Sequence, residues 1–450
     1  MQVTETTAEG LKREYRVVVP ATDLEARVNE RLDDLKGRVQ LRGFRPGKVP
    51  VVHLKRLYGK SAMAEVIETA VREANNKIID EQLKPKGEKL AAEPKVVLPT
   101  EEGAVEGVIA GKSDLAYTVE IEIVPPIALT DFKTINVVRL TAEVTDAEVD
   151  EAVQKIAEQN RPFLAKAAGA EKGDRVTLSF QGTIDAKPFD GGSGQDVPVL
   201  LGSGQMLPGF EDNLIGVKAG ESRTFDVMFP GNYPVTAVAG KTATFVVTAK
   251  SVEAPGTLTL DDDFAKTLGL ESLAKLRDVV KERIQREHAA ASRQKLKRAL
   301  LDQLDERHKF DPPPSLVEQE FNSVWAAIEA DLKQQGRTFT DEGTTEEKAR
   351  VEYRTIAERR VRLGLVIAEI GERNNIKVTD EQLTAAVMER ARQLPGQEQQ
   401  VWDYYRNNPN ALAALRAPIF EDKVIDFLLE LAEVTDRQVS REELFKEDEE

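Results

Sequence analysis

The residues best suited to binding chemistry lie in one basic segment near the N-terminus. Between Leu35 and Ala64 there are eight Lys and Arg residues and neither Asp nor Glu, although the whole chain carries a formal net charge of −16. Arginine forms forked hydrogen bonds to phosphate or carboxylate, and glycines allow a tight turn, so Phe44 beside Arg45 would place an apolar anchor next to a strong donor. The segment predicts a loop that binds a particular polyanion in a salt-sensitive way. A solvated basic face is the alternative.

Other chemistries have little support in the residue types. The chain has no cysteine, which excludes disulfides, thiolate catalysis and cysteine-based metal sites. His53, His288 and His308 are dispersed and share no ligand spacing, so we expect neither a metal nor a cofactor. Gly240-Lys241-Thr242 ends like a phosphate-binding loop but lacks the glycine needed five places earlier. The stretch Gly191–Gln195 lacks the final glycine of a nucleophile elbow.

Length and composition indicate a helix-rich protein with several domains. A chain of 450 residues suggests roughly three domains, and a hydrophobic content of 41% with 31% charged residues allows real cores under a solvated surface. The net negative charge disfavours DNA and anionic membranes as partners. No apolar run is long enough to span a bilayer, and the polar segment Met1–Gly10 does not resemble a signal peptide. We therefore expect a cytoplasmic protein.

The first part of the chain reads as an α+β domain over residues 1–112, followed by a connector over residues 113–160. Its expected elements, in chain order, are a strand at Tyr15–Val19, a helix capped by Thr22 and Glu25 and broken at Gly43–Pro50, helices from Pro50 and over Met63–Leu83, a strand over Leu115–Val124, and a connector helix capped by Thr145 and Glu148.

Residues 161–255 are rich in glycine and short β-type runs. Strands are expected at Val176–Thr183, Val197–Leu201, Arg223–Phe229 and Ala243–Val252, with a hairpin turn at Asp185–Lys187. This pattern is typical of a small β-rich domain.

Residues 256–435 form the all-helical part of the predicted fold. From Leu276 to Leu304 every fourth residue is apolar apart from His288 and Ser292, which predicts one long helix. Further helices are expected near 317–332, 346–372, 379–394 and 411–434. Residues 436–450 are expected to form an acidic tail, of which Arg441–Glu450 would be frayed. The fold class is therefore multidomain α+β, with an α+β N-terminal domain, a small β-rich domain and an all-helical C-terminal domain.

The octapeptide Gly43–Pro50 resembles the ribosome-docking signature of the bacterial trigger factor family, which lies between two helices of the N-terminal domain. The order and lengths of the segments are similar to that family along essentially the whole chain. The resemblance implies that the large ribosomal subunit, near the exit tunnel, is bound by Arg42, Gly43, Phe44, Arg45, Pro46, Gly47 and Lys48. The family often has Phe-Arg-Lys, so Pro46 removes one positive charge, for which Arg42 and Lys48 are the residues that could compensate.

The β-rich segment resembles FKBP-type prolyl isomerases in the stretches Val176–Gly182, Phe189–Gly191 and Gly204–Glu211. The resemblance implies a catalytic pocket made of Phe180, Phe189, Met206, Leu207, Phe210, Tyr233 and Phe245, with Asp190 as its carboxylate. Such a pocket removes water from the planar amide and favours the twisted X-Pro bond, so it needs no general acid or base. On residue types alone, these side chains also fit the core of a small β domain.

The resemblance as a whole implies a ribosome-associated chaperone that shields nascent polypeptides, keeps them open for folding or export, and isomerises X-Pro bonds as an auxiliary activity. The helical part would form a cradle with the N-terminal domain, although Trp325, Trp402, Tyr404 and Tyr405 fit local packing equally well. An isomerase proper and an RNA-binding protein led by the basic loop remain alternatives. Family members can form homodimers off the ribosome, and nothing in these residues decides this point.

Overall fold

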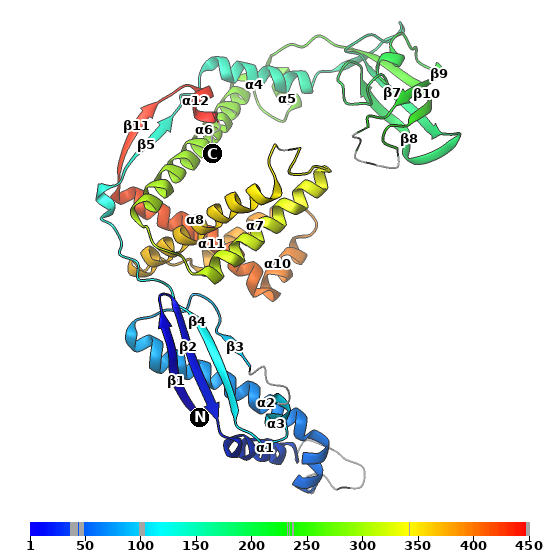
Figure 1. The fold of residues 1–450 in the computed structure, drawn as a ribbon. Coiled ribbons are helices and arrows are strands. Elements are labelled where there is room, and N and C mark those ends of the chain that lie inside the picture. The colour runs from blue at the N-terminus through cyan, green and yellow to red at the C-terminus, as the bar shows by residue number, and fades with distance from the viewer. Residues whose placement is uncertain are drawn as a thin grey trace. The chain divides into compact units, whose positions relative to one another are not determined.

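Figure 1 shows the computed structural model, which describes residues 1–36, 44, 49–98, 104–231, 233, 235, 238–341 and 343–446. The chain divides into two compact units, each assembled from segments that are distant in sequence. The first comprises Met1–Val137, Arg298–Lys333 and Arg337–Glu433, and the second comprises Val138–Lys297, Gln334–Gly336 and Val434–Glu450.

The N-terminal part is an antiparallel sheet with two long helices. Its strands follow the order β1-β2-β4-β3, where β1 is Gln2–Glu9, β2 is Lys12–Val19, β4 is Leu115–Glu122 and β3 is Lys95–Val97. Every second residue from Tyr117 to Ile123 is buried, as the alternating pattern predicts. The helices α1 (Ala21–Lys36) and α2 (Val51–Ile78) contribute apolar side chains to the same core. The small residues Ala70 and Ala74 of α2 are fully buried there.

Two helix starts that the sequence predicted for the N-terminal part are wrong. Thr22 does not cap a helix, because α1 already begins at Ala21, whose N–H donates to Asp114 Oδ1 at 2.8 Å. The two helices expected from Pro50 to Leu83 are one, since α2 continues into a π turn over Ile79–Leu83. Strand β1 was not predicted at all, because its polar sequence lacks an alternating apolar face.

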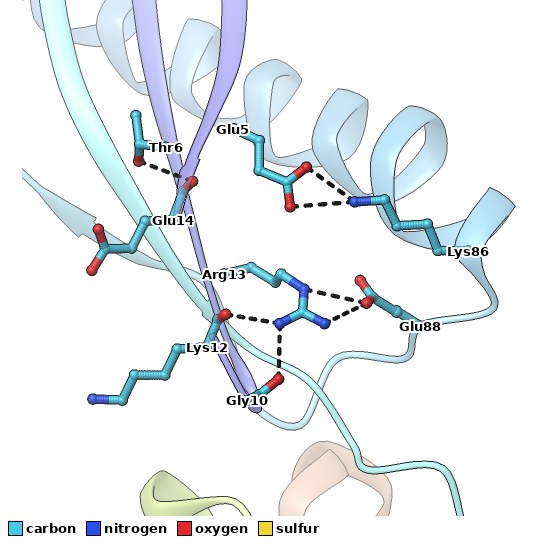
Figure 2. Close-up of polar contacts among 8 residues, drawn as sticks. All are labelled: Glu5, Thr6, Gly10, Lys12, Arg13, Glu14, Lys86 and Glu88. Carbon is cyan, nitrogen blue, oxygen red and sulfur yellow. Dashed lines mark hydrogen bonds and ion pairs between the residues drawn. The ribbon is translucent and has the colours of Figure 1, made fainter. Parts of the chain in front are cut away.

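Polar contacts attach the β1–β2 hairpin to the chain beyond α2 (Figure 2). The Arg13 guanidinium donates to Glu88 Oε1 at 2.5 and 3.2 Å and to the Gly10 carbonyl at 2.9 Å, while Lys86 Nζ contacts Glu5 at 3.0 Å. Arg13 and Glu88 are largely buried, with side chains 13% and 17% exposed. Sheet hydrogen bonds and these ion pairs hold β1, whose own side chains offer little apolar area.

The β-rich part is a five-stranded antiparallel sheet. Its order is β6-β10-β7-β8 with β9 also paired to β10, where β6 is Phe163–Ala165, β7 is Arg175–Ile184, β8 is Lys187–Leu200, β9 is Ser222–Met228 and β10 is Thr242–Pro255. The hairpin turn predicted between β7 and β8 is present. Asp185 and Ala186 both have positive φ, 52° and 62°, which is the backbone of a type I′ turn.

The helical part contains the long helix α6 (Leu273–Arg307), which confirms the prediction of one uninterrupted helix. The helices that follow in the described chain are α7 (Pro314–Gln335), α8 (Glu346–Arg373), α9 (Asp380–Arg392), α10 (Glu398–Asn407) and α11 (Pro409–Leu431). Helix α11 packs against α8, α9 and α10. Helix α10 was not predicted. None of the helices in the described part of the chain is long and apolar enough to cross a membrane.

The C-terminal segment is folded, so the expectation of a frayed tail from Arg441 is wrong as far as residue 446. Strand β11 (Glu433–Gln438) pairs with β5 (Asn136–Thr141), and the short helix α12 (Arg441–Phe445) follows. Leu444 is fully buried, and the Phe445 ring lies 5.5 Å from the His288 ring of α6. Residues 447–450 lie outside the described chain.

The polar interruptions of the α6 stripe are buried rather than exposed. His288 and Ser292 are 5% and 7% exposed. His288 Nδ1 lies 3.2 Å from the Ala142 carbonyl oxygen, and its Nε2 lies 3.7 Å from Glu148 Oε1. Glu148 belongs to α4 (Asp146–Gln159), where the predicted capping box with Thr145 is confirmed. The polar residues of α6 therefore face the connector.

Candidate functional site

A cluster of aromatic rings fills one side of the β-rich sheet. Phe210 is at its centre, with its ring 6.0 Å from Phe180 of β7, 5.3 Å from Phe225 of β9 and 5.2 Å from Phe245 of β10. The interplanar angles of these three pairs are 75°, 74° and 87°, the edge-to-face arrangement that aromatic rings favour. Phe210 is only 1% exposed, so it forms the floor of the cluster.

The rings become more accessible away from Phe210. The Phe189 ring of β8 contacts Phe245 at 6.3 Å and Phe229 at 5.7 Å, and Phe229 contacts Tyr233 at 4.8 Å. Phe229 and Phe245 are buried, whereas Phe189 and Tyr233 are half-buried. Met206 and Leu207 are also half-buried and pack against the same core. The cluster is therefore apolar from a closed floor to a partly open rim.

Glycines in β7 and β8 allow the rings to lie directly on the backbone. A Cβ atom at Gly182 would be 2.6 Å from Phe245 Cε1, and one at Gly194 would be 2.6 Å from Phe180 Cε1. Gly182 pairs with Phe245 across the strands, as Gly194 pairs with Phe180. Any side chain at these glycines would displace a ring, so the glycines determine the shape of the site.

One buried carboxylate fixes the loop that carries Met206. Glu211 Oε2 accepts hydrogen bonds from the N–H groups of Gly202 at 2.8 Å and Gly204 at 3.1 Å, and its Oε1 accepts from Met206 N–H and Ser203 Oγ at 3.1 and 3.2 Å. Burial opposes ionisation of Glu211, but these donors outweigh it, so its pKa is held below the usual value. Glu211 is therefore a positioning group, and it does not belong to the apolar wall.

The structure gathers seven of the eight residues proposed from the sequence onto this one core. The eighth, Asp190, follows Phe189 on β8 and is exposed. Sequence reasoning missed Phe225 and Phe229 as members of the cluster, although both lie on a strand that was expected, and Phe229 directly precedes Pro230. Within the described residues there is no group of three or more His, Cys, Asp or Glu side chains that could hold a metal ion.

Most of the predicted docking loop lies outside the described residues. This applies to Arg42, Gly43 and residues 45–48. Phe44 is described and is 38% exposed, with its ring 5.2 Å from the ring of His53 in the first turn of α2. Phe44 is therefore exposed beside a helix start that carries no acidic residue.

An apolar cluster of aromatic rings on a small β-sheet, an α+β domain whose sequence includes an acid-free basic segment, and a helical part together define a chaperone that carries a prolyl isomerase domain. The chain matches three family models: "Bacterial trigger factor protein (TF)" over residues 1–156, "FKBP-type peptidyl-prolyl cis-trans isomerase" over residues 166–250, and "Bacterial trigger factor protein (TF) C-terminus" over residues 272–430. It is 63% identical to the trigger factor of Azorhizobium caulinodans and 61% identical to that of Xanthobacter autotrophicus, over 100% of this chain and 99% of each relative. The chain belongs to the trigger factor family.

A solved structure supports the same fold. The structure titled "Promiscuous Substrate Recognition in Folding and Assembly Activities of the Trigger Factor Chaperone" matches with a TM-score of 0.55 and 20% identity, covering 96% of this chain and 99% of that chain. The predicted fold class is confirmed: an N-terminal α+β domain, a central FKBP-like β domain and a helical C-terminal region. The protein is thus a ribosome-associated chaperone with peptidyl-prolyl isomerase activity.

Proposed function

We propose that X-Pro isomerisation takes place in the aromatic cleft of the β-rich domain, over residues 161–255. The residues assigned to it are Phe180, Phe189, Asp190, Met206, Leu207, Phe210, Tyr233 and Phe245. The observation that carries the proposal is the gradient of burial, from Phe210 at 1% exposed to the half-buried rim at Phe189 and Tyr233. A proline ring can enter such a cleft only from the rim and must lose its water on the way.

The cleft lowers the barrier to rotation about the X-Pro bond because it offers the planar amide no polar partners. Rotation about the X-Pro bond faces a barrier of about 18–20 kcal/mol that comes from amide resonance. Water stabilises the planar, polar amide, and the rings of Phe180, Phe210 and Phe245 exclude that water. The twisted amide is less conjugated and less polar, so it loses less on entering the cleft. No proton has to move in this step, and a phenylalanine ring has no titratable group.

Substitution at the rim separates this site from the chaperone function. Phe189→Ala should lower kcat/KM for a proline peptide at least tenfold, because the rim loses a ring that contacts both Phe229 and Phe245. Suppression of client aggregation should stay within twofold of wild type. Met228→Ala is the matched control, since Met228 is 66% exposed on β9 outside the cluster. Unchanged isomerase activity in a folded Phe189→Ala variant would remove the cleft from consideration.

We assign ribosome docking to the loop over residues 42–48. Its partner is the large ribosomal subunit near the exit tunnel. The acid-free sequence around it and the exposure of Phe44 support this assignment. The double variant Phe44→Ala, Arg45→Ala should no longer sediment with ribosomes at physiological salt, while its isomerase activity on a peptide is retained. Co-sedimentation equal to wild type would contradict the assignment.

The remaining assignments complete the proposal. The N-terminal domain takes residues 1–112, the connector 113–160, the isomerase domain 161–255, the helical chaperone domain 256–435 and the acidic C-terminal segment 436–450. Nascent polypeptides are the clients, held by the helical domain together with the N-terminal domain. The protein acts in the cytoplasm and forms a homodimer when it is not on the ribosome. Sedimentation velocity at micromolar concentration with and without ribosomes tests the dimer.

A further inference from the structure

The first ten residues of α2 carry an exposed face of mixed basic and apolar character. His53, Arg56, Leu57 and Lys60 follow the spacing i, i+3, i+4 and i+7, so they lie on one side of the helix. All four are exposed, and Leu57 is 53% exposed. Leu54, on the opposite side, is fully buried in the domain core. We call these four residues the α2 face.

The α2 face lies beside Phe44, the described residue of the proposed docking loop (residues 42–48), which is called the tip below. The Phe44 ring lies 5.2 Å from the His53 ring at an interplanar angle of 42°, so the one described residue of the tip rests on the first turn of α2. Val49 is 2% exposed, which anchors the chain just before the helix. A ligand that covers Phe44 therefore has the α2 face directly beside it.

The basic residues at the start of α2 differ in whether an acidic side chain neutralises them. Lys55 Nζ contacts Glu25 Oε1 of α1 at 2.6 Å, which neutralises it and lowers the pKa of Glu25. Within the described part of the chain, neither Arg56 nor Lys60 forms an ion pair with an acidic residue. On a helix, Lys55 lies roughly 100° from Arg56, toward the buried side. The free positive charge therefore points the same way as His53.

We propose that the ribosome-docking surface extends along the α2 face, where Arg56 and Lys60 bind phosphates of ribosomal RNA and His53 supports the Phe44 ring. This inference rests on the proposed docking function of the loop. Two uncompensated cations next to an exposed aromatic anchor fit an RNA backbone, because each phosphate neutralised releases counterions. The acid-free sequence from Leu35 to Ala64 keeps carboxylates away from that contact. A protein surface is the alternative partner, and the experiment below distinguishes it from RNA.

The experiment is co-sedimentation of the full chain with ribosomes over a salt series. Arg56→Ala with Lys60→Ala should weaken binding about tenfold at low salt and reduce the slope of log K against log salt by about 1–2, since each lost phosphate contact contributes about 0.7–0.9. Lys55→Ala is the matched control and should leave both affinity and slope unchanged, because Glu25 already compensates its charge. An unchanged slope in the double variant overturns the inference.

Variants of His53 and Leu57 distinguish ring contact with Phe44 from contact with a protein partner. His53→Ala should weaken binding about threefold to tenfold with little change in the salt slope, and His53→Phe, which keeps a ring under Phe44, should restore most of it. If Leu57→Ala weakens binding while the Arg56 and Lys60 double variant does not, the α2 face contacts protein, and the RNA assignment is wrong.

A separate arm distinguishes failure of this inference from failure of the docking function. The tip variant Phe44→Ala, Arg45→Ala is sedimented beside the α2 variants. Loss of binding only in the tip variant refutes the extension and keeps the loop. Full binding by the tip variant refutes the loop assignment itself. Hydrogen exchange of the peptides that cover α1 and α2 verifies that the N-terminal domain of each variant is folded.

Discussion

Replacing Glu211 by Gln is expected to loosen the loop beneath the isomerase cleft without removing any apolar side chain. The Glu211 carboxylate is 8% exposed and accepts hydrogen bonds at both oxygens, from Gly202 and Gly204 at one and from Met206 and Ser203 at the other. Glutamine has the same shape but replaces one acceptor by an NH2 donor. Whichever way the amide is turned, at least one backbone N–H loses its acceptor.

The magnitude follows from these contacts. An unsatisfied buried donor costs about 1–3 kcal/mol, and each remaining bond changes from a charged to a neutral acceptor, a loss of roughly 1 kcal/mol. We therefore expect Glu211→Gln to reduce the free energy of unfolding of the isomerase domain by about 2–4 kcal/mol. Because Met206 lies on the released loop, kcat/KM should also fall.

The pH dependence gives an independent check. Burial opposes the charge of Glu211, but the backbone N–H donors lower its pKa below 4.5. A group with a depressed pKa in the folded state stabilises the protein above its unfolded pKa, and this stabilisation is lost as pH falls through the folded pKa. Wild type should therefore lose stability in acid below about pH 4.5, and Glu211→Gln should lack that part of the loss.

The assay is hydrogen exchange of the peptide covering residues 202–214 together with prolyl isomerisation, both on the full chain. Tryptophan fluorescence serves as an internal control, because Trp325 and Trp402 are the only tryptophans and both lie in the helical part. Glu221→Gln is the matched variant, since Glu221 accepts from Lys218 N–H at 3.0 Å but is only half-buried. Exchange and kcat/KM equal to wild type in Glu211→Gln would refute the reasoning.

Three further predictions follow from buried contacts. Gly194→Ala should destabilise the isomerase domain by about 1–3 kcal/mol and lower kcat/KM, because the new Cβ would approach Phe180 to 2.6 Å; unchanged urea unfolding and activity would contradict this. Burial raises the pKa of Tyr15 and Tyr117 to about 12 from 10.0, so stability is intact below pH 10 and falls by about 2 kcal/mol per tyrosine as pH rises to 12. Tyr15→Phe should show a smaller alkaline loss in thermal melts, and an equal loss would contradict this. Leu444→Ala should reduce the local free energy of unfolding by about 2–5 kcal/mol, because Leu444 is fully buried. The loss should appear as faster hydrogen exchange in residues 441–446, and exchange equal to wild type would contradict the burial of Leu444.

The elements that the sequence predicted best are those fixed by local patterns. The stripe of α6, the cap at Thr145 and the alternation around Tyr117 depend on neighbours within a few residues, and the structure confirms all three. Strand β1 and helix α12 lack such a pattern. Their positions depend on partners far away in the chain, such as Glu88 for the hairpin and His288 for Phe445.

The candidate site shows the same division. The rings named from family likeness gather as one cluster, but their support could not be read from the sequence. Glu211 could have been taken for a surface acid, and its role depends on the loop backbone turning three N–H groups toward it. Phe225 belongs to the cluster only because β9 pairs with β10 in the register that places it opposite Phe245. Register and loop geometry are tertiary properties, so residue types alone did not reveal them.

The return of the C-terminal segment to the connector has a consequence for how this protein is made. The Thr141 hydroxyl reaches the carbonyl of Arg437 across 296 residues of sequence, and Val439 N–H donates to Thr141 O at 2.9 Å. Translation proceeds from the N-terminus, so β5 must wait, unpaired, until β11 has left the tunnel. Closing so large a loop is a late and slow event. A chaperone that receives other growing chains thus completes its own connector only late in its own synthesis.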